Sequence, residues 1–167
     1  MNASAMDTLD RVAGLDERGE LFAIRRERPE YVAGIEQCRD SVLTPHDERR
    51  LPAALRTALA VRMARASGAL SLQTHYQQRL ASYDPGSWLR DIAAGNAPVG
   101  AAGWIQAVVE HCDRVTCSPA QSRRQDIERL LAAGLTTPQI VALSELIAFV
   151  NFEARVAAGL TLLEAMP

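Results

Sequence analysis

The chain has 167 residues, with 18 basic and 20 acidic side chains and a formal net charge of −2. This length suits one compact domain with a substantial core. Every basic residue is arginine, which excludes lysine chemistry such as Schiff-base formation. The near-neutral charge and the lack of a basic stripe argue against nucleic acid as a partner.

Composition predicts an all-α fold. Apolar residues make up 48% of the chain and aromatic residues only 5%, with alanine and leucine prominent, and this favours helix over sheet. We expect residues 1–28 to form an N-terminal arm or a short helix that can wrap a neighbouring subunit. Residues 29–167 are predicted to form a single helical domain.

The sequence predicts a cytoplasmic protein without a cofactor. The first ten residues lack the basic start and apolar run of a secretory signal. Glu145, Asn151 and Arg155 interrupt the apolar stretches, which argues against a membrane span. Three cysteines at irregular spacing suit free thiols in a reducing compartment.

The first predicted helix starts at Pro29, a residue suited to an opening turn. Tyr31, Ile35, Cys38 and Val42 follow at helical spacing and form one apolar stripe. We therefore expect this stripe to face the core, with Cys38 as a small buried residue.

Further helices are predicted along the rest of the chain. Thr44 can cap a helix that begins at Pro45, and a longer helix should run from about Pro52 to Gly68. The helix after that covers residues 70–83 and ends at the Asp84-Pro85-Gly86 turn. The remaining predicted helices cover residues 87–94, 97–116, 119–133 and 137–165.

The last predicted helix, residues 137–165, is apolar almost all round. Such a helix must be covered on most sides, and a domain of this size rarely encloses one completely. Part of its surface should therefore meet another copy of the chain, so we expect a homo-oligomer.

A weak internal repeat relates two parts of the chain. Thr44-Pro45 resembles Thr137-Pro138, and an arginine, Arg62 or Arg155, follows each proline after the same 17 residues. This pattern suggests two weakly similar halves, although coincidence remains the alternative because arginine is frequent here.

Residues 67–76 carry the most informative motif. Their sequence, Ser-Gly-Ala-Leu-Ser-Leu-Gln-Thr-His-Tyr, follows an arginine-punctuated helical stretch. Together they resemble the AhpD-like alkylhydroperoxidase branch of the carboxymuconolactone decarboxylase superfamily, where such a helix runs into Ser-Gly-Cys-x-x-Cys-x-x-His. Residues 149–160 resemble the ending of peroxidase-related members. The resemblance covers residues 43–163 and implies an AhpD-like helical bundle, a trimer or hexamer, and a small hydroperoxide or carboxylated ligand.

The resemblance also places the family's catalytic groups on this chain. The two cysteines fall on Ala69 and Leu72, and the relay glutamate and histidine fall on Thr57 and Tyr76. His75 matches a neighbouring histidine of some relatives. Peroxide reduction by a dithiol needs a thiolate and a resolving thiol, so the motif has the family's layout without its sulfur.

The candidate site residues each have a structural and a functional interpretation. His75 is either a half-buried imidazole or a general acid or base, and Tyr76 is either a packed aromatic or a hydrogen-bond donor to ligand. Arg62 and Arg155 lie in apolar sequence, so each needs a partner such as Glu145 or Glu153. Alternatively, the two arginines hold a carboxylated ligand.

The other cysteines do not replace the missing pair. Cys112 and Cys117 are five residues apart, which is poor geometry for a disulfide on one helix. His111 and Cys112 also miss the spacing of zinc ligands, so no metal site is predicted.

Three functions stay open from the sequence. The first is the family's thiol peroxidase, or peroxiredoxin-type, activity. The second is a cysteine-independent decarboxylase or isomerase with His75 as acid or base. The third is a non-catalytic oligomer that binds a small ligand or a partner protein.

Overall fold

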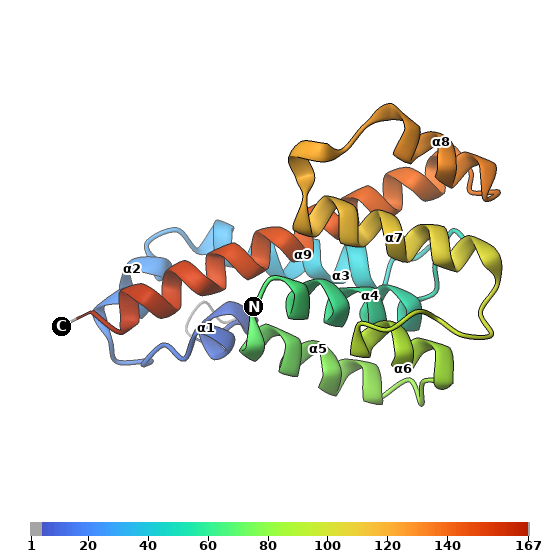
Figure 1. Cartoon of the computed structure of the whole chain (residues 1–167). Coiled ribbons are helices and arrows are strands. Elements are labelled where there is room, and N and C mark those ends of the chain that lie inside the picture. Colours follow the sequence, from blue (N-terminus) through green and yellow to red (C-terminus); the bar gives the residue numbers. More distant parts are fainter. Residues whose placement is uncertain (1–4, 167) are drawn as a thin grey trace.

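The structure, a computed structural model, describes residues 5–166 and consists of helices and loops, with no strand in that range (Figure 1). The all-α prediction is therefore confirmed. Residues 1–4 of the predicted arm and residue 167 of the predicted domain lie outside the described residues. The elements are α1 (Thr8–Ala13), α2 (Glu20–Arg26), α3 (Pro29–Leu43), α4 (Ala53–Ala66), α5 (Leu70–Ala81), α6 (Ser87–Ala94), α7 (Gly103–Cys117), the 3₁₀ turn η1 (Pro119–Gln121), α8 (Arg124–Ala132) and α9 (Thr137–Glu164).

Helix α4 lies at the centre of the core. It contacts α5, α6, α7 and α9, and Leu55, Ala58, Leu59 and Met63 along it are almost completely buried. Small alanines alternate with these large side chains, so neighbouring helices can approach on several sides. The helix that leads into the motif is thus enclosed by neighbours on several sides.

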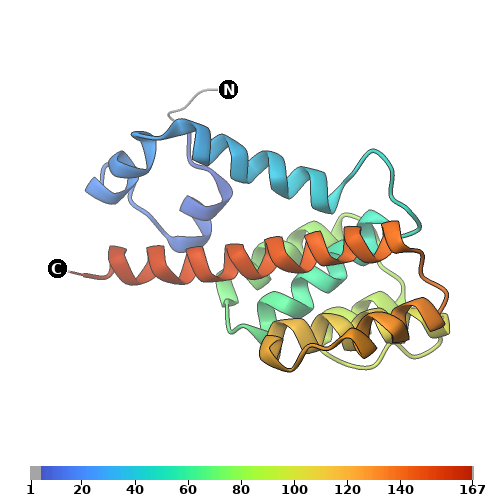
Figure 2. The same cartoon turned by 90° about the horizontal axis from the view of Figure 1, so that it is seen from above.

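Helix α9 runs along the length of the molecule (Figure 2). It begins where the Gln139 side chain accepts a hydrogen bond from the Thr136 backbone N–H at 2.7 Å. By length and composition this helix could cross a membrane, but 44% of its most apolar stretch is buried in the protein. Its buried Glu153 and its contacts with α1, α3, α4 and α7 are typical of a core helix.

Two short helices occupy the region predicted as an arm or short helix. Helix α1 packs against α9 and α5, with Leu9 and Asp10 fully buried. Asp10 forms ion pairs with Arg25 and Arg26 of α2. The ion pairs join α1 to α2, and the packing of α1 on α5 and α9 holds the N-terminal segment on the domain that begins at α3.

The prediction of a helix that begins at Pro45 is wrong. Thr44 ends α3 instead, and residues 45–52 form a loop. The buried Arg56 guanidinium binds that loop, since it donates to the backbone carbonyls of Glu48 and Leu51 at 3.2 and 2.7 Å. It also donates to the Val42 carbonyl in the last turn of α3 at 2.9 Å. Only one of the two related prolines, Pro138, therefore opens a helix.

The orientation predicted for α3 is also wrong. Tyr31 and Cys38 are exposed, and Ile35 is only half-buried, whereas Arg39 is buried. The reason is that Arg39 forms an ion pair with Glu153 of α9, and this pair turns the Arg39 side of α3 inward. The apolar stripe consequently lies at the surface beside α9.

The other predicted helices match the structure with shifts at their starts. Helix α7 begins at Gly103 instead of residue 97, and the predicted helix 119–133 divides into η1 and α8. Gly100, in the early part of the segment predicted as residues 97–116, has a left-handed backbone with φ 80°, which explains the delayed start of α7.

The packing around α4 makes a direct prediction about stability. Leu59→Ala should lower the free energy of unfolding by about 2–5 kcal/mol, because it removes a fully buried side chain and leaves a cavity. The matched control is Leu131→Ala on α8, where the side chain is 46% exposed. Urea unfolding measures both, and equal effects would contradict the position assigned to α4.

Candidate functional site

The motif lies at the turn between α4 and α5. Gly68 adopts a left-handed conformation with φ 71°, which favours glycine, and α5 begins two residues later. Beside this turn is a surface cavity of about 390 Å³, open to solvent, between α5, α9 and α1. It is lined by Val12, Gly68, Ala69, Leu70, Ser71, Leu72, Ala157, Ala158, Thr161 and Leu162.

The two positions expected to carry thiols both line this cavity. Ala69 is half-buried and Leu72 is fully buried. The relay position Thr57 is also buried, and its hydroxyl donates to the Ala53 carbonyl of its own helix at 2.8 Å. Thr57, Ala69 and Leu72 therefore supply no thiol, carboxylate or imidazole to the motif.

Tyr76 belongs to a buried polar network behind the motif. Its hydroxyl, which is completely buried, donates to Glu153 Oε2. Arg39 donates to Glu153 Oε1 from Nε at 2.8 Å and also forms an ion pair with Glu36 at 2.6 Å. Glu36 in turn accepts from the Thr8 backbone N–H at 2.8 Å. The network joins α1, α3, α5 and α9.

The electrostatics keep the Tyr76 proton in place. Burial and the Glu153 carboxylate hold the pKa of Tyr76 well above its ordinary value. Burial also raises the pKa of Glu153, against the lowering influence of Arg39 and the Tyr76 hydroxyl. Tyr76 is consequently a neutral donor committed to Glu153, and it is not among the residues that line the cavity beside Ala69.

His75 lies next to Tyr76 but apart from that cavity. Its ring meets the Tyr76 ring edge-on, with the centroids 5.5 Å apart. The Nε2 atom is buried, with no hydrogen-bond partner among the described residues. Burial, reinforced by Arg39 and Arg11, lowers the pKa of His75, so the imidazole is neutral at pH 7.

The structure does not bring the two candidate arginines together. Arg62 makes a bidentate ion pair with Asp113 at 2.7 and 2.8 Å and also donates to the Asn96 carbonyl. The predicted pairing of Arg62 with Glu145 or Glu153 is therefore wrong. Arg155 is exposed and donates to the Asn151 carbonyl of its own helix. The prediction that Arg155 lies in apolar surroundings is therefore wrong too.

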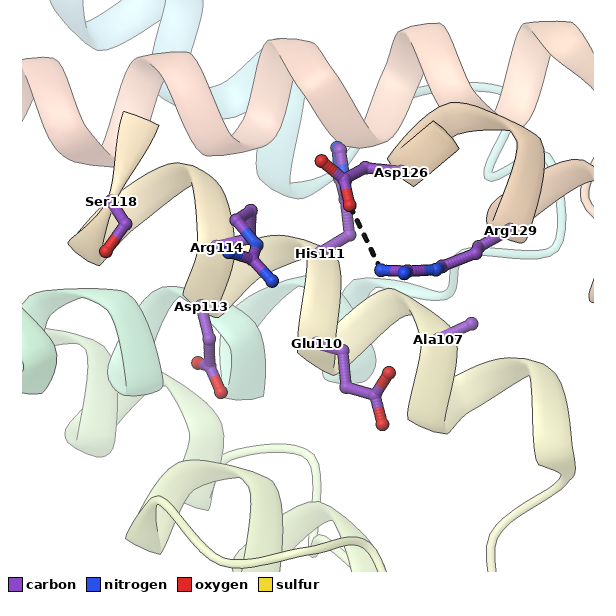
Figure 3. A pocket seen from close by; sticks show the side chains of 8 residues that line it. All are labelled: Ala107, Glu110, His111, Asp113, Arg114, Ser118, Asp126 and Arg129. Atoms are coloured by element: carbon purple, nitrogen blue, oxygen red, sulfur yellow. Dashed lines mark hydrogen bonds and ion pairs between the residues drawn. The ribbon is translucent and has the colours of Figure 1, made fainter. Parts of the chain in front are cut away.

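Sequence reasoning missed a polar pocket of about 420 Å³ between α7 and α8 (Figure 3). Arg129 points into it and pairs with Asp126 at 3.2 Å. His111 at its wall is only 8% exposed. Burial lowers the pKa of this imidazole. No local pattern signals this pocket, because it exists only after α8 folds back on α7.

The chain has three free cysteines, none of which lies at the motif. Cys112 is buried, and burial raises the pKa of its thiol, which disfavours the reactive thiolate. Cys38 and Cys117 are exposed on different helices. No group of three or more metal-ligating side chains occurs in residues 5–166.

Comparison of the chain with known protein families, with curated proteins and with solved structures finds no match. The family resemblance therefore depends on the motif residues themselves.

The buried network predicts a large effect of removing its cation. Arg39→Met should lower the free energy of unfolding by about 3–5 kcal/mol, because Glu153 would stay buried without a counter-charge. The double variant Arg39→Met/Glu153→Gln should recover much of this loss, since the second substitution removes the carboxylate charge and keeps an acceptor for Tyr76. Denaturant unfolding of each variant checks both expectations.

A matched control exists on α8, where the exposed Arg124 pairs with Glu128. Arg124→Met should cost at most about 1 kcal/mol. If Arg39→Met proved as mild as this control, the account of the network would be incorrect.

The lowered pKa values of His75 and His111 predict a pH dependence of stability. Unfolding frees both imidazoles to bind protons, so stability should fall as the pH drops below about 6.5, the ordinary histidine pKa. The variant His75→Asn/His111→Asn should show a smaller fall. Urea midpoints at pH 7.5 and 5.5 measure this, with His46→Asn at an exposed site as control.

An unchanged pH slope in the double variant would show that neither histidine is held neutral in the folded state.

Proposed function

We propose that the chain is an AhpD-like helical protein that binds a small apolar molecule at the motif and does not use thiol chemistry. The observation that carries this proposal is the cavity beside the α4–α5 turn, where Ala69 and Leu72 stand at the thiol positions. A hydroperoxide in this cavity would meet methyl and isobutyl groups in place of a nucleophile.

The lining of the cavity defines the ligand class. Its side chains are aliphatic apart from Ser71 and Thr161, and the Thr161 hydroxyl already lies 3.4 Å from the Ala13 carbonyl. A volume of about 390 Å³ falls in the range of small-molecule sites. The occupant is therefore a small, largely apolar molecule with at most one or two polar atoms.

A second candidate function depends on His75. Its neutral imidazole has a buried Nε2 atom without a partner among the described residues, which suits a general base in a cysteine-independent decarboxylase or isomerase. The first candidate is favoured because His75 lies outside the motif cavity and Tyr76 is committed to Glu153.

The proposal includes a cytoplasmic location and assembly into a homo-oligomer. The apolar character of α9 and its partial exposure support assembly. A trimer or hexamer is the state that the family resemblance implies.

Filling the cavity tests the ligand proposal. The probe is 2-naphthol, an apolar bicycle with one hydroxyl, and its binding is followed by its own fluorescence. Ala158→Phe places an aromatic ring in the cavity and should abolish binding. The control Ala132→Phe introduces the same ring on exposed α8 and should leave binding unchanged. Failure of the wild-type chain to bind the probe, or equal binding by Ala158→Phe, would contradict the proposal.

A hydroperoxide assay separates the proposal from the family's usual activity. The purified chain should not consume tert-butyl hydroperoxide in the presence of a thiol reductant, and a Cys38→Ser/Cys112→Ser/Cys117→Ser variant should behave identically. Turnover that disappears in the triple variant would establish thiol chemistry and contradict the proposal.

A further inference from the structure

One face of α9 is exposed along most of the helix. In Figure 2, no other helix crosses in front of it between α3 and the α7–α8 pair, within the described residues. We call this the α9 face, and its members are Val141, Glu145, Ala148, Phe152, Arg155 and Gly159, all of them exposed.

The spacing of the α9 face is that of a helix-packing seam. Successive members are separated alternately by four and three residues, which keeps them on one straight stripe. From Val141 to Gly159 the stripe extends about 27 Å, at 1.5 Å per residue. A second helix can therefore pack along it over several turns.

The α9 face is also complementary to itself. Its members are placed symmetrically about position 150, so a second α9 running antiparallel brings each residue opposite a matching one. Glu145 meets the partner's Arg155, Phe152 meets the partner's Ala148, and Val141 meets the partner's Gly159. Each pairing joins opposite charges or a large side chain with a small one.

We infer that the α9 face is the two-fold interface of a homodimer, with α9 of each copy antiparallel to the other. The charges select this direction. In a parallel pair, Glu145 would face Glu145 of the partner subunit and Arg155 would face Arg155 of the partner subunit, and like charges in contact are unfavourable. In the two-fold symmetric arrangement, the ion pair between Glu145 and the partner's Arg155 forms twice, once at each end of the interface.

The surface next to the α9 face adds apolar area to this interface. A groove of about 530 Å³ lies between α3 and α9, lined by Tyr31, Ile35, Cys38 and Phe149, among others. Phe152, a member of the α9 face, also lines it. Tyr31 and Phe152 are 58% and 43% exposed in one copy. A second copy on the α9 face would cover part of this apolar surface, which favours association.

This inference does not depend on the ligand cavity, and it refines the expected oligomer. A two-fold contact is compatible with a dimer or a hexamer but does not occur within a simple three-fold trimer.

Charge exchange across the interface tests the inference on the full chain. Glu145→Arg places two arginines together at each end, and Arg155→Glu places two carboxylates together. Each single variant should weaken dimerisation by about tenfold or more. The double variant Glu145→Arg/Arg155→Glu should restore it, because the opposite charges face each other again. Sedimentation equilibrium measures the dissociation constants, and circular dichroism confirms that every variant is folded.

The matched control is Glu128→Arg, a charge reversal on exposed α8, which should leave association unchanged. A wild-type chain that stays monomeric, single variants that associate normally, or a double variant without rescue would each overturn the inference. A monomer that floats with neutral phosphatidylcholine vesicles would also overturn it and assign the face to a lipid surface.

Discussion

The fold depends on one buried ion pair, between Arg39 of α3 and Glu153 of α9. Glu153 is fully buried, and a carboxylate in that position requires a cation and further hydrogen-bond donors. Arg39 supplies the cation, and the Tyr76 hydroxyl supplies another donor. Because these residues belong to α3, α9 and α5, satisfying one carboxylate determines how three helices lie relative to one another.

This constraint also shapes the chemistry near the motif. The polar atoms of Tyr76 and Glu153 are directed toward each other, which leaves aliphatic side chains around the cavity beside Ala69 and Leu72. Helices α5 and α9 therefore contribute both to the polar network and to the lining of the apolar cavity. On this arrangement we base the proposal that the cavity binds an apolar molecule, since proton transfer needs a group with a pKa near the working pH.

Sequence reasoning predicted the elements whose signals are local. Glycine and proline residues next to the helix ends predicted the bounds of α6 and the long α9 closely, and the apolar pattern predicted the position of α4. The packing of α3 could not be predicted, because the stripe with Tyr31 and Cys38 is a more regular apolar pattern than the face with Arg39. Glu153 was a candidate partner for a buried arginine, but its mate is Arg39, 114 residues away, and one sequence holds no signal for such a pair. The polar pocket at His111 likewise forms only through tertiary contacts.

Direct measurement of Tyr76 ionisation tests the central claim that its proton is committed to Glu153 in a closed site. Carbon-13 NMR of the phenol carbon bonded to oxygen, assigned by comparison with Tyr76→Phe, follows this group while amide signals report folding. We predict that Tyr76 stays protonated through pH 10, the ordinary tyrosine pKa, for as long as the protein is folded. Ionisation of Tyr76 at or below pH 10 in the folded protein would contradict it.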